Sequence, residues 1–331
     1  MRRPGAACIP PPLAFRRAKS HHASVTIRDE LQRISPERLG RDLFHISRDP
    51  LPYRAVNRRR RGQARNTLEE ADHYIRGELA SAGCAVTRTT HRVQAFRCDR
   101  TKPLHHWYST PDPGDPFHDV TNLEALLRGR ELPREYIQLV SHKDSMSWIN
   151  SPGAHDNAVG TVANLELARA VAGLTLRRSV RILFCNEEHT PWTSRFAAEA
   201  AAARGDVIVA VLNQDSLDGK SDEEMAAGRM THVVGWSTEE GRELAAMVAG
   251  CAERHAIPLE VSVACKEPVN DDDGMYINAG FRRAVMNIGS WPYGDSQYHM
   301  PGDTPDRVNI RNLELSTMLI LAAILELDAM P

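Results

Sequence analysis

The stretch Tyr136–Ser145, YIQLVSHKDS, marks the point where the pattern of the chain changes. Its first five residues are typical of a buried strand, and the polar residues that follow leave that strand for a loop. Before this point, Gly129 and Arg130 separate the expected strands Leu123–Leu127 and Tyr136–Val140, which predicts a hairpin-like turn and an antiparallel region of sheet. After it, strands and helices alternate, as is typical of parallel crossover units.

The remaining elements follow from periodicity. Thr67–Ala82 has apolar residues at helical spacing, with Thr67 and Glu70 as an expected capping box, and Ala85–Phe96 alternates as a strand does, before a loop at 102–119. Further helices are expected at Ala158–Ala172, Ser194–Arg204, Glu239–His255 and Leu313–Leu327, and further strands at Val180–Cys185, Val207–Leu212, His232–Val234, Leu259–Val263 and Arg283–Ile288. The predicted fold class is α/β, a three-layer αβα sandwich around one mixed, centrally parallel β-sheet.

Composition limits the classes of protein to consider. The 331 residues are 42% hydrophobic and 25% charged, which is enough for one large domain, expected at 25–331 after a disordered leader at 1–24. The net charge of −2 argues against nucleic acid or an anionic membrane as the main partner, and the run Arg58–Arg61 is interpreted as solvated surface.

The cysteines and the apolar segments bear on location. The six cysteines are scattered, without the paired short spacing of a thiolate zinc site or a small disulfide scaffold, so free thiols are expected. The sequence has no apolar stretch of membrane-spanning length and no clear export signal. Together these features weakly favour the cytoplasm.

Five candidate metal ligands are far apart in the chain, and each is expected where a strand gives way to a loop. They are His142, Asp156, Glu188, Asp215 and His299. The ends of neighbouring strands converge at one edge of an open α/β sheet, so such residues can meet there. Three buried carboxylates repel one another unless cations compensate them, which predicts two divalent ions.

Each ligand segment also has an ordinary structural interpretation. Asp144 stands two residues after His142 and can reach its imidazole, although a surface pair would have the same spacing. Asp156 precedes an expected helix, where it or Asn157 could serve only as a cap. A carboxylate in that turn can instead give one oxygen to each of two ions roughly 3.5–4 Å apart.

The remaining candidates are ambiguous in the same way. The adjacent Glu187 and Glu188 follow a strong strand, where one carboxylate would bind a cation and the other exchange a proton, although exposed pairs of glutamates are common. Asp215 at a strand end could also be a turn cap. The hydroxyl of Tyr298, beside His299, could donate a hydrogen bond to a developing oxyanion.

With these five segments in this order, the chain resembles the co-catalytic zinc exopeptidases of metallopeptidase clan MH, the aminopeptidase Y group, from about Thr67 to the C-terminus. The family segments histidine-x-aspartate, alanine-aspartate-aspartate-asparagine, glycine-glutamate-glutamate, asparagine-x-aspartate and tyrosine-histidine-threonine are similar to His142–Asp144, Ala154–Asn157, Asn186–Glu188, Asn213–Asp215 and Tyr298–Met300. The joint order and spacing of the segments carry the resemblance.

The resemblance implies a role for each site residue. Two Zn²⁺ ions are expected, with His142 and Asp215 on one, Glu188 and His299 on the other, and Asp156 between them. Glu187 is then the general base, Asp144 orients the imidazole of His142, and Tyr298 donates to the oxyanion. The chain departs from the family at Asn186, at the loop Thr190–Ser194 and at His155, where the family has an aspartate.

The predicted function is a di-zinc metallopeptidase, an aminopeptidase that hydrolyses the N-terminal peptide bond of a peptide or small aminoacyl substrate. Imidazole and carboxylate sites also accept Mn²⁺ or Co²⁺. The alternatives are a single-zinc enzyme similar to glutaminyl cyclases and a non-catalytic peptidase-like domain that binds partners. The sequence sets neither the preferred side chain nor the oligomeric state.

Overall fold

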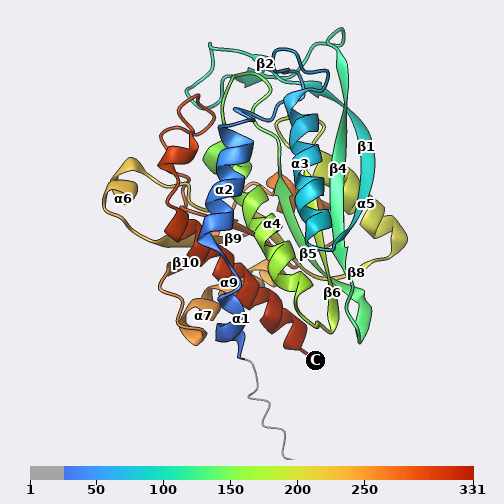
Figure 1. Ribbon diagram of the computed structural model, residues 1–331, viewed down its shortest axis with the longest axis vertical. Coiled ribbons are helices and arrows are strands. Elements are labelled where there is room, and N and C mark those ends of the chain that lie inside the picture. Colours follow the sequence, from blue (N-terminus) through green and yellow to red (C-terminus); the bar gives the residue numbers. More distant parts are fainter. Residues whose placement is uncertain (1–25) are drawn as a thin grey trace, which may run out of the picture.

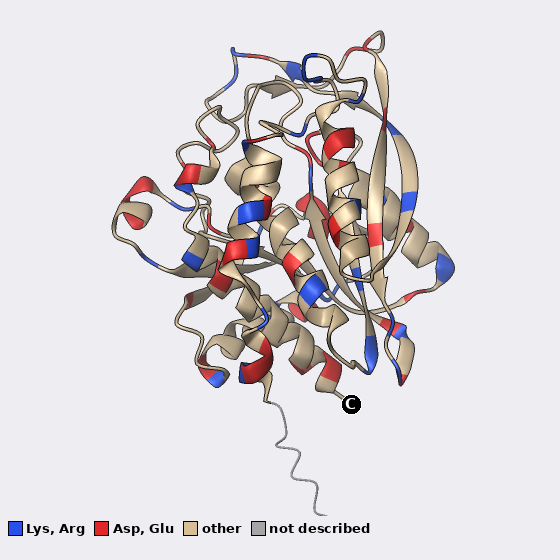
Figure 2. Cartoon of the chain, in the orientation of Figure 1, with Lys and Arg blue, Asp and Glu red and all other residues tan. Residues whose placement is uncertain are grey.

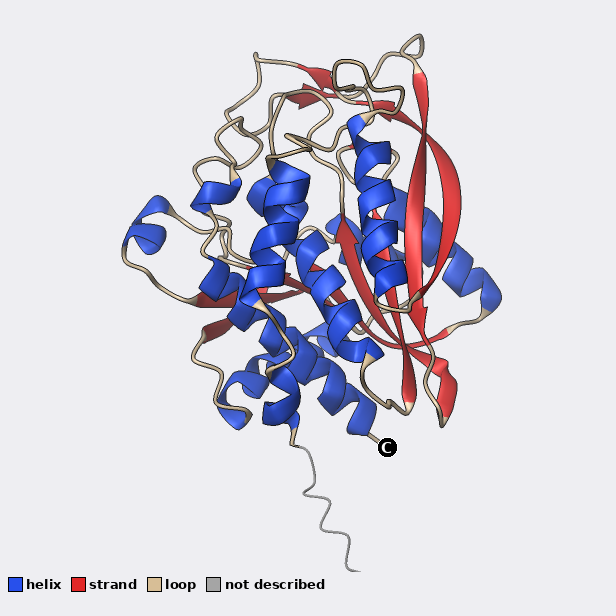
Figure 3. Cartoon of the chain, in the orientation of Figure 1, coloured by secondary structure: helices blue, strands red, loops and turns tan. Residues whose placement is uncertain are grey.

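A computed structural model describes residues 26–331, and the expected leader at 1–24 lies outside the described residues. Its main feature is a mixed sheet of nine strands in the order β10-β9-β11-β8-β5-β6-β4-β1-β7, with helices packed on both faces (Figures 1 and 3). The centre of the sheet is parallel, because β5 pairs in parallel with β6 and with β8. The predicted three-layer α/β architecture is confirmed.

The elements have the following bounds. The helices are α1 (Ile27–Leu31), α2 (Pro36–Ser47), α3 (Thr67–Ser81), α4 (Val159–Ala172), α5 (Thr193–Arg204), α6 (Asp222–Ala226), α7 (Glu239–Arg254), α8 (Asp271–Asn278) and α9 (Ile310–Ala329), with short helical turns η1 (Ala154–Ala158) and η2 (Pro305–Arg307). The strands are β1 (Ala85–Ala95), β2 (Arg97–Cys98), β3 (Tyr108–Ser109), β4 (Phe117–Leu127), β5 (Leu132–His142), β6 (Arg178–Cys185), β7 (His189–Thr190), β8 (Val207–Gln214), β9 (Thr231–Trp236), β10 (Glu260–Cys265) and β11 (Ala284–Ile288).

Two apolar cores hold the layers together. The larger core joins α2, α3, α4, α7 and α9 to one face of the sheet, and the smaller core joins α5 and α8 to the other face. Every residue of β6 is buried, as expected for a central strand covered on both sides. Apolar burial of this kind is the main favourable term in folding, and it makes the central strands a fixed frame for the loops at their ends.

One predicted connection is wrong. The antiparallel pairing of this region is real, but β4 pairs with β1 and β6, and β6 lies between β4 and β5, so these two strands do not form a hairpin. The turn at Gly129 and Arg130 instead contacts the start of β6, where the Arg130 amide donates to the carbonyl of Leu176. A Cβ on Gly129 would lie 2.3 Å from the carbonyl carbon of Arg178, so glycine is required there for close packing.

Smaller corrections concern helix ends and short elements. The capping box of α3 is formed by Asn66 and Glu69 rather than by Thr67 and Glu70, because the Thr67 hydroxyl bonds the buried carbonyl of Ala55. The helices α1, α2, α6 and α8 and the short strands β2, β3 and β7 were not predicted, although Ser35 followed by Pro36 is a recognisable start for α2.

The distribution of charged residues, the cysteines and the hydropathy of the helices agree with the expectations from composition. Basic and acidic positions are interspersed along the chain in Figure 2, and Arg60 of the basic run pairs with Glu70. The five described cysteines are free. Within residues 26–331, no helix is both long enough and apolar enough to cross a membrane.

Shortening a buried side chain of the central sheet should destabilise the protein. We expect Ile182→Ala, at a fully buried position in β6, to lower the free energy of unfolding by about 2–5 kcal/mol, because it leaves a cavity in the larger core. The control Val207→Ala, at a position 54% exposed, should change it by less than about 0.5 kcal/mol. Equal losses in urea unfolding would contradict this account of the core.

Candidate active site

Three adjacent parallel strands carry half of the candidate site. His142 is the last residue of β5, Glu187 and Glu188 follow β6, and Asp215 follows β8. The other two candidate ligands are not at strand ends, which corrects the expectation from sequence. Asp156 lies in η1 just before α4, and His299 lies in the loop between β11 and η2.

The five candidate ligands meet at one place. His142 Nε2 lies 3.1 Å from Asp156 Oδ1 and 3.7 Å from Asp215 Oδ1. His299 Nε2 lies 3.1 Å from Asp156 Oδ2 and 3.6 Å from Glu188 Oε1. Asp156 therefore directs one carboxylate oxygen towards each imidazole. The cluster consists of two sets of side chains that share this carboxylate.

The donor set fits metal ions. Neutral imidazoles and carboxylates are suitable ligands for zinc, and His142, Asp156 and Glu188 bring one ligand atom each within 4.8 Å of one another. Glu187 Oε2 is buried without a hydrogen-bond partner among the described residues. Buried carboxylate oxygens in that condition are costly unless a cation or a proton reaches them.

The pKa values of the ionisable groups show where the protein retains protons that a metal ion would replace. Burial and the neighbouring Asp156 raise the pKa of Glu188 to about 7, and burial raises the pKa of Asp215 to about 6. Burial disfavours the imidazolium of His299, but the charges of Glu188 and Asp156 prevail and raise its pKa to about 10. The protein alone thus keeps protons at positions where metal ions would displace them.

Asp144 connects the strand ends that carry the cluster. Its Oδ1 lies 3.4 Å from His142 Nδ1, on the side of the ring away from Asp156. The same carboxylate accepts the backbone amides of Glu187 at 2.9 Å and Glu188 at 3.0 Å. One buried aspartate therefore fixes the orientation of an imidazole and the position of the paired glutamates.

Two further supports were not predicted from sequence. The carbonyl of His105 accepts the Nδ1 proton of His299 at 2.6 Å, which turns Nε2 towards Asp156. Asp303 accepts the backbone amides of His155 at 2.8 Å and Asp156 at 3.1 Å, which fixes the η1 turn. A histidine in a loop rich in proline and aspartate gives no sequence signal of such a role.

A third unpredicted support is Arg54. Its guanidinium is completely buried and donates to the carbonyls of Ile46, Lys143, Pro152 and Gly153 at 2.7–2.8 Å. Lys143 follows His142, and Gly153 precedes the turn that carries Asp156. Arg54 therefore ties the two segments that present the shared carboxylate and one imidazole.

A small cavity of about 140 Å³ opens on the cluster. Aromatic side chains form much of its wall, namely Phe96, Tyr108, Trp148, Trp192 and Tyr298. The ring of Tyr298 stacks on His299 with 3.8 Å between ring centroids, and Trp148 meets His299 edge-on at 5.0 Å. The predicted site residues Glu187 and Tyr298 both line this cavity.

Two other groups of metal-ligand residue types are explained by ion pairs. His155 has ring nitrogens 3.0 Å from Asp295 and 3.4 Å from Asp218, and Arg307 also pairs with Asp295 at 3.0 Å. Lys220 pairs with Asp218 at 3.1 Å. These cations compensate the acids of that cluster, so it does not require a metal ion.

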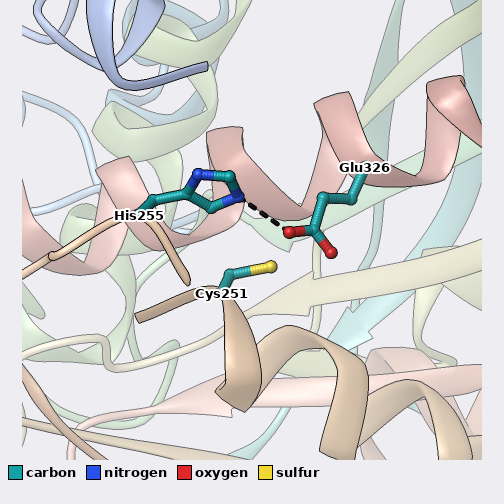
Figure 4. A group of neighbouring side chains, drawn as sticks. All are labelled: Cys251, His255 and Glu326. Carbon is teal, nitrogen blue, oxygen red and sulfur yellow. Dashed lines mark hydrogen bonds and ion pairs between the residues drawn. The ribbon is translucent and has the colours of Figure 1, made fainter. Parts of the chain in front are cut away.

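The second group joins the ends of α7 and α9 (Figure 4). His255 Nε2 lies 2.7 Å from Glu326 Oε1, and Cys251 lies beside them. Arg254 pairs with the other oxygen of Glu326 at 2.6 Å. Burial, followed by the charge of Glu326, raises the pKa of Cys251 to about 12, so the thiol is neutral and unreactive.

A mixed sheet whose parallel strands end at or just before His142, Glu188 and Asp215, close to a second histidine and a shared aspartate from neighbouring loops, fits a zinc-dependent peptidase. Residues 122–324 match peptidase family M28, and the chain belongs to that family. This confirms the resemblance to zinc exopeptidases seen in the sequence. Comparison with curated proteins finds no match.

Solved structures share the fold at low sequence identity. The LapA aminopeptidase of Legionella pneumophila superposes with a TM-score of 0.70 at 17% identity, over 92% of this chain and 75% of that chain. An aminopeptidase from Aneurinibacillus sp. strain AM-1 gives 0.69 at 13% identity, over 91% and 96%. A glutaminyl cyclase of Bacteroides thetaiotaomicron gives 0.67 at 15% identity, over 88% and 97%.

Arg54 offers a direct test of how the site is held. We expect Arg54→Lys to lower the free energy of unfolding by about 3 kcal/mol, because lysine cannot satisfy four buried carbonyls in the same geometry. Zinc retention during dialysis should fall with it. The control Arg59→Lys, at an exposed position, should leave both unchanged. A fully stable, zinc-retaining Arg54→Lys protein would contradict this role.

Proposed function

We propose that the protein is a di-zinc aminopeptidase that hydrolyses the N-terminal peptide bond of peptides or small aminoacyl amides. The observation that carries the proposal is the position of Asp156, with one oxygen 3.1 Å from each of two imidazole nitrogens on separate histidines. A carboxylate shared in this way is suited to bridging two metal ions. Membership of peptidase family M28 supports the reaction class.

The residues divide between two ions. His142 and Asp215 would hold one zinc, Glu188 and His299 the other, and Asp156 would contact both. When bound, the two ions would lower the pKa of a water molecule towards neutrality and polarise the carbonyl of the substrate. Mn²⁺ or Co²⁺ could occupy the same donors, because the set contains only nitrogen and oxygen.

Glu187 is the proposed general base. Its carboxylate lines the cavity, and burial, followed by the charges of Asp271 and Asp272, raises its pKa well above the usual value. A basic carboxylate in this position can take a proton from the attacking water and later give it to the leaving amine. Asp144 holds the backbone of Glu187 in place, and Tyr298 is the proposed hydrogen-bond donor to the oxyanion.

The size of the cavity supports exopeptidase action. A space of about 140 Å³, lined by aromatic rings, accommodates the end of a peptide more readily than a chain that passes through. The names of the superposed aminopeptidases point in the same direction. We therefore assign the free N-terminal residue of the substrate to this cavity.

The role of Glu187 can be tested separately from metal binding. Glu187→Gln should lower kcat on an aminoacyl p-nitroanilide by about 10²–10⁴-fold, because the amide cannot accept the proton. Zinc content, measured by elemental analysis, should stay at the parental value. Glu199→Gln, on the exposed face of α5, is the matched control. Parental turnover by Glu187→Gln would overturn the assignment.

Removal of the metal should destabilise the protein in a pH-dependent way. Because the folded pKa of Glu188, about 7, exceeds its ordinary value of 4.5, this group stabilises the metal-free protein at low pH, and that contribution is lost as pH rises through 7. Zinc replaces the lost protons. Added zinc should therefore raise the Tm of the chelator-treated protein more at about pH 8 than at about pH 6. A pH-independent increment would contradict this.

A glutaminyl cyclase is the second candidate, because the superposed structure from Bacteroides thetaiotaomicron has that name. Such an activity would release ammonia from peptides with an N-terminal glutamine and would require one zinc per chain. Elemental analysis and an ammonia assay on a glutaminyl peptide separate the two functions. Two zinc ions per chain and no ammonia release favour the aminopeptidase.

A further inference from the structure

We propose that the cavity selects substrates whose N-terminal residue has a positively charged side chain, and that Asp271 binds this charge. The inference rests on the proposed aminopeptidase function and names the class of substrate. The cavity wall carries more carboxylates than the proposed metal ligands and general base account for.

The described residues that line the cavity include five acids and neither lysine nor arginine. The acids are Asp156, Glu187, Glu188, Asp215 and Asp271. Three of them are the proposed zinc ligands and Glu187 is the proposed base, so Asp271 is the one lining acid to which the hydrolytic reaction assigns no role. When all five are ionised, their negative charge exceeds the positive charge that two zinc ions would supply.

Asp271 is only partly compensated by the protein. The ammonium of Lys266 lies 3.9 Å from Asp271 Oδ2, but it lies closer to Asp273, at 2.7 Å, and to the carbonyl of Asn270, at 2.8 Å. One lysine is thus shared by two carboxylates. The side chain of Asp271 is 20% exposed, so a cation inside the cavity can reach it.

The negative charge of Asp271 lies close to the proposed general base. Asp271 lines the same cavity as Glu187 and Asp215, so the three negative charges repel one another. A substrate cation beside Asp271 would reduce this repulsion, whereas an acidic side chain would add to it. The same cavity would therefore favour lysine or arginine and exclude glutamate or aspartate.

The aromatic wall suits such a side chain. Trp148, Trp192 and Tyr108 line the same cavity. The faces of aromatic rings attract cations and also pack against the methylene groups of lysine and arginine. Neutral apolar residues would gain the packing and lose the electrostatic attraction.

Asp271→Asn is the appropriate variant. Asp271 has a φ of 75°, in the left-handed region, where asparagine is tolerated better than most residues, so the backbone is preserved while the charge is removed. Asp306→Asn, at a side chain 58% exposed outside the cavity, is the matched control.

The experiment compares pairs of p-nitroanilides that differ mainly in charge, lysyl with norleucyl and arginyl with citrullyl, on the zinc-loaded enzyme. We expect kcat/KM to favour the charged member of each pair by at least about tenfold, equivalent to about 1.4 kcal/mol. Asp271→Asn should remove most of that preference within each pair, because KM should rise for the lysyl and arginyl substrates more than for the norleucyl and citrullyl ones. Asp306→Asn should keep the preference.

Each other outcome is decisive. Equal rates on charged and neutral members, or a preference for norleucine, overturn the inference and leave the aminopeptidase function standing. An equal loss on all four substrates in Asp271→Asn also overturns it, because Asp271 would then bind the common α-ammonium or support Glu187. If the zinc-loaded parent hydrolyses none of the four, the proposed function fails and the inference fails with it.

Discussion

The repulsion among the buried carboxylates that gather beside the ends of β5, β6 and β8 is the constraint on which the rest of the site depends. Asp156, Glu188 and Asp215 converge within a few ångströms of two histidines, in a place that burial makes unfavourable for charge. Without metal ions, Glu188, Asp215 and His299 retain their protons to a higher pH than usual, because the pKa of each is raised. A fold that keeps such a cluster together needs positive charge there.

Such a cluster also needs a rigid frame, because carboxylates free to move would separate. The frame comes from groups that bond backbone rather than metal: Asp144 on the amides of the paired glutamates, Asp303 on the amide of Asp156, and Arg54 on four carbonyls. Arg54 lies outside the segment 122–324 that matches the family, so the N-terminal part of the chain contributes to the geometry of the site. The helices and the sheet fix the two ends of each loop that carries site residues. These polar contacts then fix the position of the loop itself.

The sequence predicts the parts of this arrangement that depend on local pattern. The long helices α3, α4, α5, α7 and α9 and the central strands follow from periodicity, because one face of each must be buried. The pairing of β4 could not be predicted in the same way. Its partners β1 and β6 are chosen by packing between distant segments, whereas the short turn at Gly129 suggested a local hairpin.

The candidate site also has residues that the sequence predicts and residues that only the structure reveals. Its eight predicted residues belong to short motifs of characteristic composition, and the structure brings them to one cavity or its immediate support. Arg54 and His105 belong to no such motif. A guanidinium that bonds only carbonyls, and a histidine that acts through its own carbonyl, are defined by tertiary structure alone.

The same charge that requires metal ions also shapes what the cavity can accept. Bound zinc would neutralise the proposed ligands but would leave the charge of Asp271, whose lysine partner is closer to another carboxylate. Electrostatic attraction to a substrate cation is therefore strongest where the metals and the protein leave compensation incomplete. An acid that serves neither as ligand nor as base is a cost to the folded protein, and a bound positive charge would offset that cost.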